Sequence, residues 1–98
     1  MKKINFSKHV TEDRMDRYLF IATHMGFGEI IHETWDDDKY NYKCITSTGV
    51  VLVLSPDKET VITLFLGDYD KIYALMKGEV PAELKKTLKQ YAKKGWIK

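Results

Sequence analysis

His9 and Arg17 are the residues of this chain whose types and spacing best suit the chemistry of a phosphodiester. On a helix they fall on one side together with Asp13, because residues four apart are neighbours on a helix surface. A nearby carboxylate orients a histidine, and an arginine can hold a phosphate through two hydrogen bonds. RNA cleavage needs a base for the ribose 2′-hydroxyl and cations for the pentacovalent transition state. The spacing therefore fits metal-independent RNA cleavage, with a solvated helix face carrying ordinary charge pairs as the alternative.

Hydroxyl side chains supply a second set of candidate groups. Ser47 and Thr48 stand beside Gly49 at a predicted strand end, and Thr63 lies inside a later strand. Hydroxyls and backbone amides at such a place can position a phosphate, although threonine is also common in strands for structural reasons alone. The catalytic group that we predict consists of His9, Arg17 and Thr63. The phosphate-positioning group consists of Ser47, Thr48 and Arg14.

The charge of the chain is divided unevenly along its length. Residues 1–76 carry 9 Lys and Arg against 12 Asp and Glu, whereas residues 77–98 carry 7 against 2, so the two parts differ in sign, at −3 and +5. A basic tail can follow nucleic-acid phosphates or dock an acidic partner, and lysines on an amphipathic helix are also an ordinary solvated face. The nucleic-acid-binding residues that we predict here are Lys85, Lys86, Lys89 and Lys93.

Metal and disulfide chemistry have little support. His24 and His32 are eight residues apart and match no metal motif, and the three aspartates at 36–38 lack the alternation of a calcium loop. We therefore expect no metal and no cofactor. Cys44 is the only cysteine, which excludes an internal disulfide, and its place in an alternating segment favours a buried thiol over a nucleophile.

The candidate residues depend on a helix and a set of strands to position them. Ser7 suits the N-cap of a helix that runs to about Met25, with apolar residues at three- and four-residue spacing and glycines after its end. Four strands are then expected, at Glu29 to Thr34, Tyr40 to Thr46, Val50 to Leu54 and Thr60 to Leu66. Because Val50 to Leu54 is almost wholly apolar, we place it at the centre of the sheet.

Two further helices follow, a short one from Asp70 to Met76 and a longer one opened by Pro81. The order of elements predicts an α+β domain, in which an N-terminal helix packs on a twisted antiparallel sheet of three to four strands and a basic helix ends the chain. The length of 98 residues fits a single domain, 1–98. Since no signal peptide or membrane span is evident, we expect a cytoplasmic protein without membrane partners.

Two segments of the sequence together resemble a known family. These are FSKHVTEDRMDRY, with His9 and then Arg17, and TSTGVVLVLSPDKETVITLFL, with a Gly-Val-Val run and the Ile62-Thr63 dipeptide. They are similar to segments of the small bacterial ribonuclease toxins of the RelE, barnase and colicin-like superfamily. Many members have a further arginine four residues after the histidine, where this chain has Asp13 and, one step on, Arg14.

The resemblance implies a metal-independent endoribonuclease toxin that acts on RNA and is neutralised by an acidic antitoxin. His9 would be the acid or base, Arg17 the phosphate clamp and Thr63 a phosphate-positioning hydroxyl. The main alternative is a non-catalytic phage or mobile-element accessory protein that binds and inhibits a host protein or a nucleic-acid complex. A nucleic-acid-binding module without cleavage is the third reading. The sequence predicts neither the RNA sequence recognised nor the oligomeric state.

Overall fold

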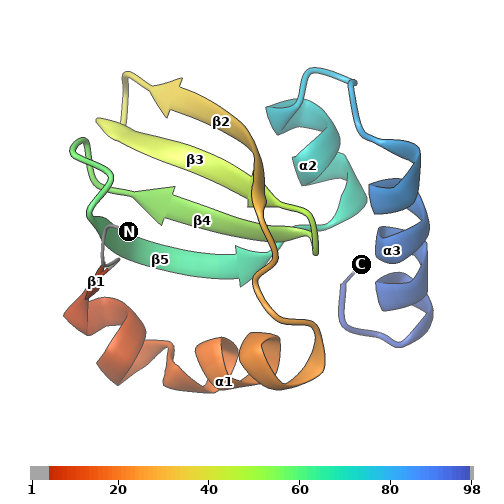
Figure 1. The fold of residues 1–98 in the computed structure, drawn as a ribbon, viewed down its shortest axis with the longest axis horizontal. Helices are drawn as coiled ribbons and strands as arrows, with labels where there is room; N and C mark the ends of the chain where they lie inside the picture. The colour runs from red at the N-terminus through yellow and green to blue at the C-terminus, as the bar shows by residue number, and fades with distance from the viewer. Residues whose placement is uncertain (1–4, 98) are drawn as a thin grey trace.

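A computed structural model describes residues 5–97, except the side chains of His9 and Asp13. It is an α+β fold in which a sheet is flanked by helices (Figure 1). The elements in chain order are β1 (Asn5–Phe6), the π-helical turn η1 (His9–Asp13), α1 (Met15–His24), β2 (Ile30–Asp36), β3 (Asn41–Thr46), β4 (Val50–Leu54), β5 (Thr60–Leu66), α2 (Tyr69–Leu75) and α3 (Ala82–Lys93).

The sheet has five strands in the order β1-β5-β4-β3-β2. Neighbouring strands are antiparallel except for β1, which runs parallel to β5 and pairs Asn5 with Thr60 and Phe6 with Val61. The sheet is therefore mixed, and the predicted antiparallel sheet of three to four strands is corrected on this point. A two-residue strand is too short to show the period-2 alternation by which strands are recognised, so the sequence pattern could not reveal β1.

The N-terminal helix is interrupted, in contrast to the continuous helix predicted from Ser7 to Met25. The break lies at Arg14, whose φ of −125° is not helical, between η1 and α1. Ser7 does not act as a side-chain cap; its hydroxyl donates to the Ile62 carbonyl at 2.8 Å, while its carbonyl accepts from the amides of Val10 and Thr11. Ser7 therefore ties the start of η1 to strand β5.

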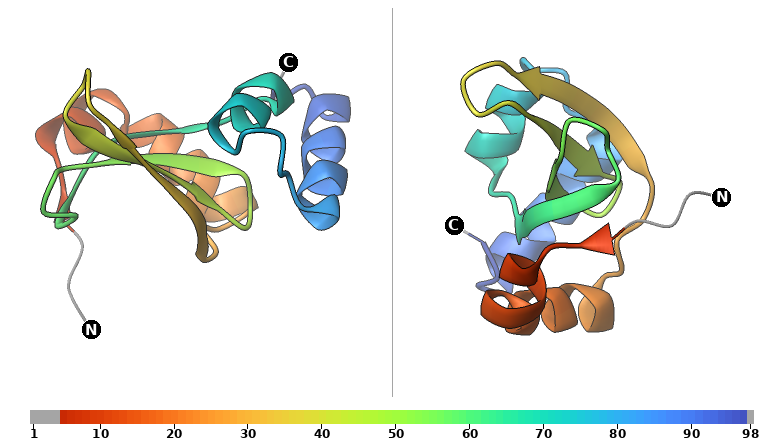
Figure 2. Two further views of the ribbon diagram at one scale, coloured as in Figure 1. Left: turned by 90° about the horizontal axis from the view of Figure 1, so that it is seen from above. Right: turned by 90° about the vertical axis from the view of Figure 1, so that its left-hand side faces the viewer.

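Each face of the sheet has its own apolar cluster. On one face Val10 and Ile21, from η1 and α1, pack with Cys44, Leu52 and other strand residues. On the opposite face Ile45 and Val51 pack against buried side chains of α2 and α3. Strand β4 is buried at all five positions, which confirms its predicted central place. The two perpendicular views show that α1 and the α2–α3 pair lie apart from each other against the sheet (Figure 2).

Helix α3 confirms the predicted division between an apolar and a basic side. Leu84, Leu88 and Tyr91 are buried, whereas the predicted lysines are exposed. The Tyr91 hydroxyl donates to the Thr48 carbonyl at 2.8 Å, which joins α3 to the turn between β3 and β4. Among residues 5–97, no helix is long and apolar enough to span a membrane.

Candidate functional site

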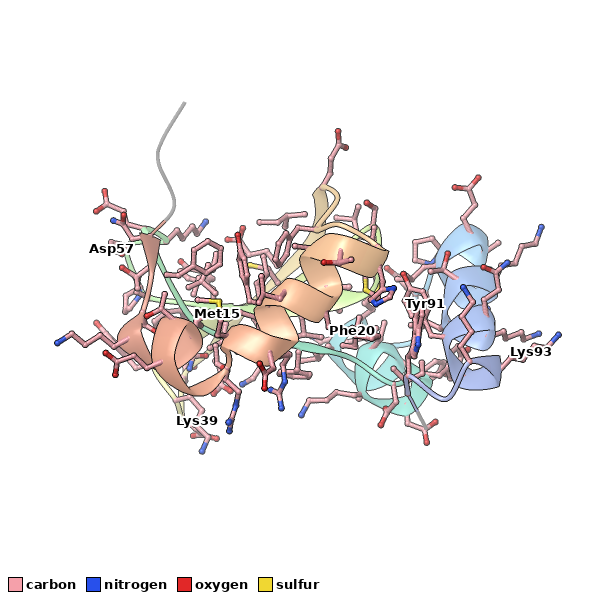
Figure 3. The ribbon with its side chains drawn as sticks, turned by 90° about the horizontal axis from the view of Figure 1, so that it is seen from below. Met15, Phe20, Lys39, Asp57, Tyr91 and Lys93 are labelled. Carbon is pink, nitrogen blue, oxygen red and sulfur yellow. The ribbon has the colours of Figure 1, made fainter. Side chains whose placement is uncertain are left out.

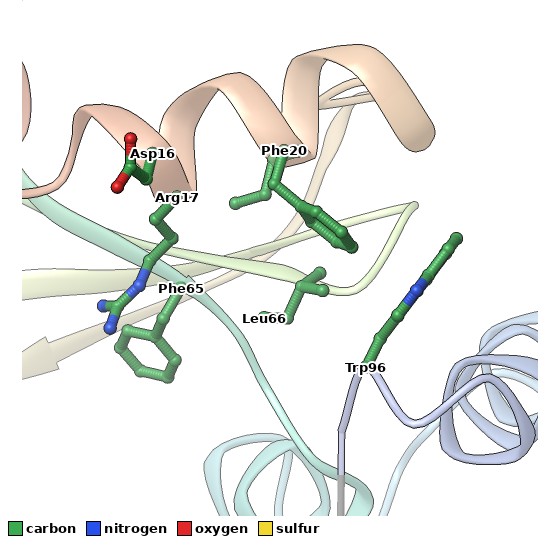
Figure 4. Close-up of a pocket in the computed structure, with 7 residues that line it drawn as sticks. Asp16, Arg17, Phe20, Phe65, Leu66 and Trp96 are labelled. Atoms are coloured by element: carbon green, nitrogen blue, oxygen red, sulfur yellow. The ribbon is translucent and has the colours of Figure 1, made fainter.

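A cleft of about 450 Å³ opens between α1, strand β5 and the segment that follows α3 (Figure 4). Its volume lies within the range of small-ligand pockets, which is roughly 300 to 1,000 Å³. Two charged side chains meet a mainly aromatic lining. The lining residues are Asp16, Arg17, Phe20, Ile21, Phe65, Leu66 and Trp96.

Helical spacing brings the α1 residues of the cleft together. Arg17, Phe20 and Ile21 follow at three- and four-residue steps, so they share one side of the helix. Ile21 is fully buried in the core, whereas Arg17 is exposed at the cleft. The packing of Ile21 therefore fixes how Arg17 and Phe20 are presented.

The last wall of the cleft is built by the end of α3. The amide of Trp96 donates to the Tyr91 carbonyl and that of Gly95 to the Ala92 carbonyl, the paired bonds of a Schellman motif. Gly95 has the positive φ, 77°, that this motif requires. The turn folds the chain back, so that the Trp96 and Tyr91 rings lie 5.4 Å apart. Trp96 is thereby placed opposite α1.

Arg17 is held at the unpaired outer edge of strand β5. Its Nη1 donates to the Leu64 carbonyl at 3.2 Å, in the part of β5 that β1 does not cover. A guanidinium has five N–H donors, so most of them remain for a ligand. The guanidinium lies beside the Phe65 ring (Figure 4), and Lys71 Nζ lies 4.9 Å from the centroid of the same ring. Arg17 and Phe65 both line the cleft, whereas Lys71 is not among its lining residues.

Phe20, His24 and Trp96 form a group of rings at the other end of the cleft. The Phe20 and Trp96 rings meet edge to face, with centroids 5.2 Å apart at 88°. His24 lies 4.5 Å from Phe20 and 5.4 Å from Trp96. Lys94 Nζ is 4.6 Å from the centroid of the Trp96 ring. The cleft thus has a charged end, with Asp16 and Arg17, and an aromatic end at Trp96.

Thr63 and the η1 segment lie along the same strand as the cleft. Thr63 is half-buried in β5 opposite Val53, two residues before Phe65 and hence on the same face of the sheet. Turn η1 packs against β5, close to the bond between Ser7 and Ile62. The structure therefore brings the backbone of His9 and the side chain of Arg17 to the strand that carries Thr63. Thr63 itself lies, like Phe65, on the side of the sheet that faces α2 and α3, opposite the side covered by η1 and α1. The side chain of His9 lies outside the described part of the chain.

Ser47 and Thr48 lie apart from this group, at the turn between β3 and β4. The Thr48 hydroxyl donates to the Gly26 carbonyl at 2.8 Å and also lies 3.2 Å from the Phe27 carbonyl. The Ser47 hydroxyl accepts from the Glu29 amide at 3.1 Å. These bonds fasten the segment that follows α1, so both hydroxyls have a structural role where they stand.

The other sequence-predicted residues are placed as follows. Arg14 is half-buried at the junction of η1 and α1. The α3 lysines lie on the outer surface, and Lys93 extends away from α1 and the cleft (Figure 3). His32 Nε2 lies 3.1 Å from the Leu75 carbonyl and 2.8 Å from the Thr34 hydroxyl. Across the described residues, no three or more His, Cys, Asp or Glu side chains form a group that could hold a metal ion.

Comparison with known proteins adds no relative: no protein-family model matches the chain, and neither a curated protein nor a solved structure matches it. The family resemblance therefore rests on the motif residues given above.

Sequence patterns missed the aromatic part of the cleft. Trp96 belongs to no motif of the sequence, and Phe65 is one residue of an apolar strand. A glycine after a lysine-rich helix does predict a Schellman turn, which returns the next residue to the helix. That signal at Gly95 was available for Trp96. No local sequence pattern predicts that β5 and α1 lie opposite Trp96.

Proposed function

We propose that this domain binds RNA in the cleft and cleaves it without a metal, with Arg17 holding the scissile phosphate. The observation that carries the proposal is the position of Arg17 in the cleft, where it is held at the edge of β5 beside the Phe65 ring with N–H donors to spare (Figure 4). A guanidinium at a concave site is suited to a phosphate whose charge increases in the transition state.

In the proposed reaction His9 removes the proton of a ribose 2′-hydroxyl. The 2′-oxygen attacks phosphorus and the bond from phosphorus to the 5′-oxygen breaks, which leaves a 2′,3′-cyclic phosphate and a 5′-hydroxyl. The leaving 5′-oxygen takes up a proton, for which the protonated histidine is a source. Arg17 stabilises the pentacovalent intermediate, and Thr63 donates a hydrogen bond to a phosphate oxygen.

The π-helical turn supports a place for Arg14 in this site. In the resembled family the second arginine follows the histidine by four residues, whereas here it follows by five. The hydrogen bonds of a π-helix span five residues instead of four, so η1 accommodates one extra residue between positions 9 and 14. Such turns are frequent at functional sites. We therefore keep Arg14 as the second cation of the proposed site.

The proposal extends to partners. A toxin of this type requires a neutralising protein, and an acidic antitoxin would complement the cations of the cleft and the lysines of α3. The exposed lysines of α3 supply a second, weaker contact with the RNA backbone, because none of them lines the cleft and Lys93 extends away from it (Figure 3).

Cleavage of single-stranded RNA in EDTA tests the proposal. The parent should cut, and the products should end in 2′,3′-cyclic phosphate. His9→Ala should lose at least about a hundredfold in rate, the usual contribution of a general base. His32→Gln is the matched control, since His32 lies on β2 and is bonded to α2. RNA with 2′-deoxyribose at the cleavage position should resist.

Two outcomes would contradict the proposal. Equal cleavage by the parent and His9→Ala would remove His9 from the mechanism. No cleavage by the parent, with RNA or a host protein still bound, would favour the non-catalytic binding protein instead.

A further inference from the structure

We propose that Ser7 is a positioning residue for His9, because its hydroxyl bond to β5 fixes η1, and with it the backbone of His9, along the strand edge that Arg17 also contacts. This inference rests on the proposed function, since it adds a residue that sets the geometry of the same site. Ser7 lies two residues before His9 and belongs to none of the groups that the cleavage chemistry uses.

Ser7 is bonded to the strand on one side and to η1 on the other. Its amide donates to the Val61 carbonyl at 3.0 Å, and its hydroxyl donates to the Ile62 carbonyl at 2.8 Å. Its carbonyl accepts from the amides of Val10 and Thr11, both at 3.1 Å. One residue therefore connects β5 with the π-helical turn.

The Ile62 carbonyl is available to Ser7 because β5 contains a bulge. The consecutive pairs between β4 and β5 are Val53 with Thr63 and Leu54 with Val61. Ile62 is therefore the extra residue of the bulge and has no partner on β4. An unpaired carbonyl needs a donor, and the Ser7 hydroxyl supplies one. Bulges are frequent next to active sites, where they redirect groups of the strand.

The turn η1 needs such a bond to keep its place. It has five residues, too few for a stable helix on their own, and no side-chain bond caps its N-terminus. Arg14 breaks the helical path between η1 and α1, so α1 does not continue the turn. Val10 is buried in the core and holds η1 against the sheet. Apolar contacts are non-directional, whereas a hydrogen bond also fixes the position along the strand.

Ser7 and Arg17 both bond to carbonyls of β5, at Ile62 and at Leu64. The segment between them is therefore fixed to the strand at both ends, and His9 lies inside it. Reacting groups have to be placed closely, because an error of about 1 Å can cost on the order of a hundredfold in rate. Loss of the Ser7 hydroxyl should therefore slow the chemical step and leave RNA binding by Arg17 intact.

Cleavage of single-stranded RNA in EDTA by Ser7→Ala and Ser7→Thr tests the inference. Ser7→Ala removes only the hydroxyl, and it should lower kcat at least about tenfold with little change in KM. Ser7→Thr keeps a hydroxyl and should restore most of the rate. Tyr91→Phe is the matched control and should cleave like the parent, because it removes a hydroxyl on α3 whose bond to the Thr48 carbonyl is also 2.8 Å long. The unfolding midpoint of each variant is measured alongside, so that only folded protein is compared.

A double variant shows whether Ser7 acts through His9. His9→Ala has lost the proposed base, so adding Ser7→Ala should cause no further loss of rate. A general disturbance of the structure would instead lower the rate by the same factor with and without His9.

Amide hydrogen exchange, followed by NMR, gives a second readout that does not depend on cleavage. The amides of Val10 and Thr11 should exchange about tenfold faster in Ser7→Ala, because η1 opens more often. The amide of Met25 donates to the Ile21 carbonyl at the end of α1, and its exchange should not change.

The outcomes separate this inference from the proposed function. If the parent cleaves RNA and Ser7→Ala keeps its kcat, the positioning role is wrong and the ribonuclease proposal stands. A loss of rate that persists in the His9→Ala background, that Tyr91→Phe shares, or that leaves exchange in η1 unchanged also overturns the inference. If the parent does not cleave RNA, the proposed function fails and the role of Ser7 fails with it.

Discussion

The hydroxyl of Thr48 shows how one residue type serves two purposes that a sequence cannot distinguish. At a strand end beside glycine it suits phosphate binding, yet here it bonds to carbonyls of the segment that follows α1. The same ambiguity holds for Ser47, whose hydroxyl accepts from the Glu29 amide. A stability measurement distinguishes the structural role from the phosphate-binding role. A hydroxyl that bonds within the protein contributes to the free energy of unfolding, whereas a hydroxyl that contacts only a ligand does not.

Replacing Thr48 by Val should lower the free energy of unfolding by about 1 to 2 kcal/mol, since partly buried carbonyls lose their donor. Ser47→Ala, at an exposed position, should cost under about 1 kcal/mol. Urea unfolding measures both. Cleavage per folded molecule should be unchanged in Thr48→Val. A fall in cleavage at unaltered stability would instead assign Thr48 to phosphate positioning.

Cys44 is a second residue whose role is decided by burial. It is fully buried in β3, and burial raises the pKa of its thiol from 9.0 to about 11. The native thiol should therefore resist a thiol-specific reagent at pH 8 and react after unfolding. Rapid labelling of the native protein would contradict this.

The same pKa shift predicts how stability depends on pH. The unfolded thiol ionises near 9 and the folded thiol near 11, so above pH 9 ionisation favours the unfolded chain. The contribution of Cys44 to stability is complete below pH 9 and is lost as the pH rises toward 11. Cys44→Ala should show less loss of stability over that interval in chemical unfolding at pH 8 and pH 11. Equal losses in the two proteins would contradict the assignment to Cys44.

At the scale of elements, Gly67 controls how closely α2 approaches the sheet. A Cβ atom at this position would lie 2.8 Å from Ile72 Cγ1 and 3.0 Å from Val51 Cγ2. Gly67→Ala should therefore destabilise the protein by about 1 to 3 kcal/mol, the usual cost of overpacking. Gly26→Ala is the comparison, since only backbone strain applies where no atom lies within 4 Å of the added carbon. If thermal unfolding shows a smaller loss of stability for Gly67→Ala than for Gly26→Ala, the close packing of α2 on the sheet at Gly67 is contradicted.

In helix α3 different residues stabilise the fold and carry the charge, so the charge can be changed to test RNA docking without disturbing the core. Its lysines are exposed and its leucines are buried. Changing the lysines at 85, 86, 89 and 93 to Gln should leave stability within about 0.5 kcal/mol. RNA binding should weaken and its salt dependence should become shallower, because each lost phosphate contact reduces the slope by about 0.7 for single strands. If the slope of log affinity against log salt concentration, measured by filter binding, does not change, the RNA contacts the cleft and not the α3 lysines.

At the scale of the whole molecule, the periodic elements could be predicted from the sequence. The bounds of β4 and β5 match those expected, because an apolar run and a β-branched segment are set by their own residues. The pairing of β1, the π-helical turn and the return of Trp96 to α1 depend on contacts between distant segments. Arg17 was predicted as a site residue from spacing, but its aromatic surroundings emerge only when α1, β5 and the end of α3 meet.

The most direct measurement of the central claim is the rate of RNA cleavage in EDTA by the parent, Arg17→Lys and Arg17→Gln, with the unfolding free energy of each. Arg17→Gln should lose at least about a hundredfold in rate, and Arg17→Lys should lose less because it retains the charge without the two-bond geometry. Stability should fall by only about 1 kcal/mol, the value of the bond to the Leu64 carbonyl. Parent-like cleavage by Arg17→Gln, or no cleavage by the parent, would contradict the account.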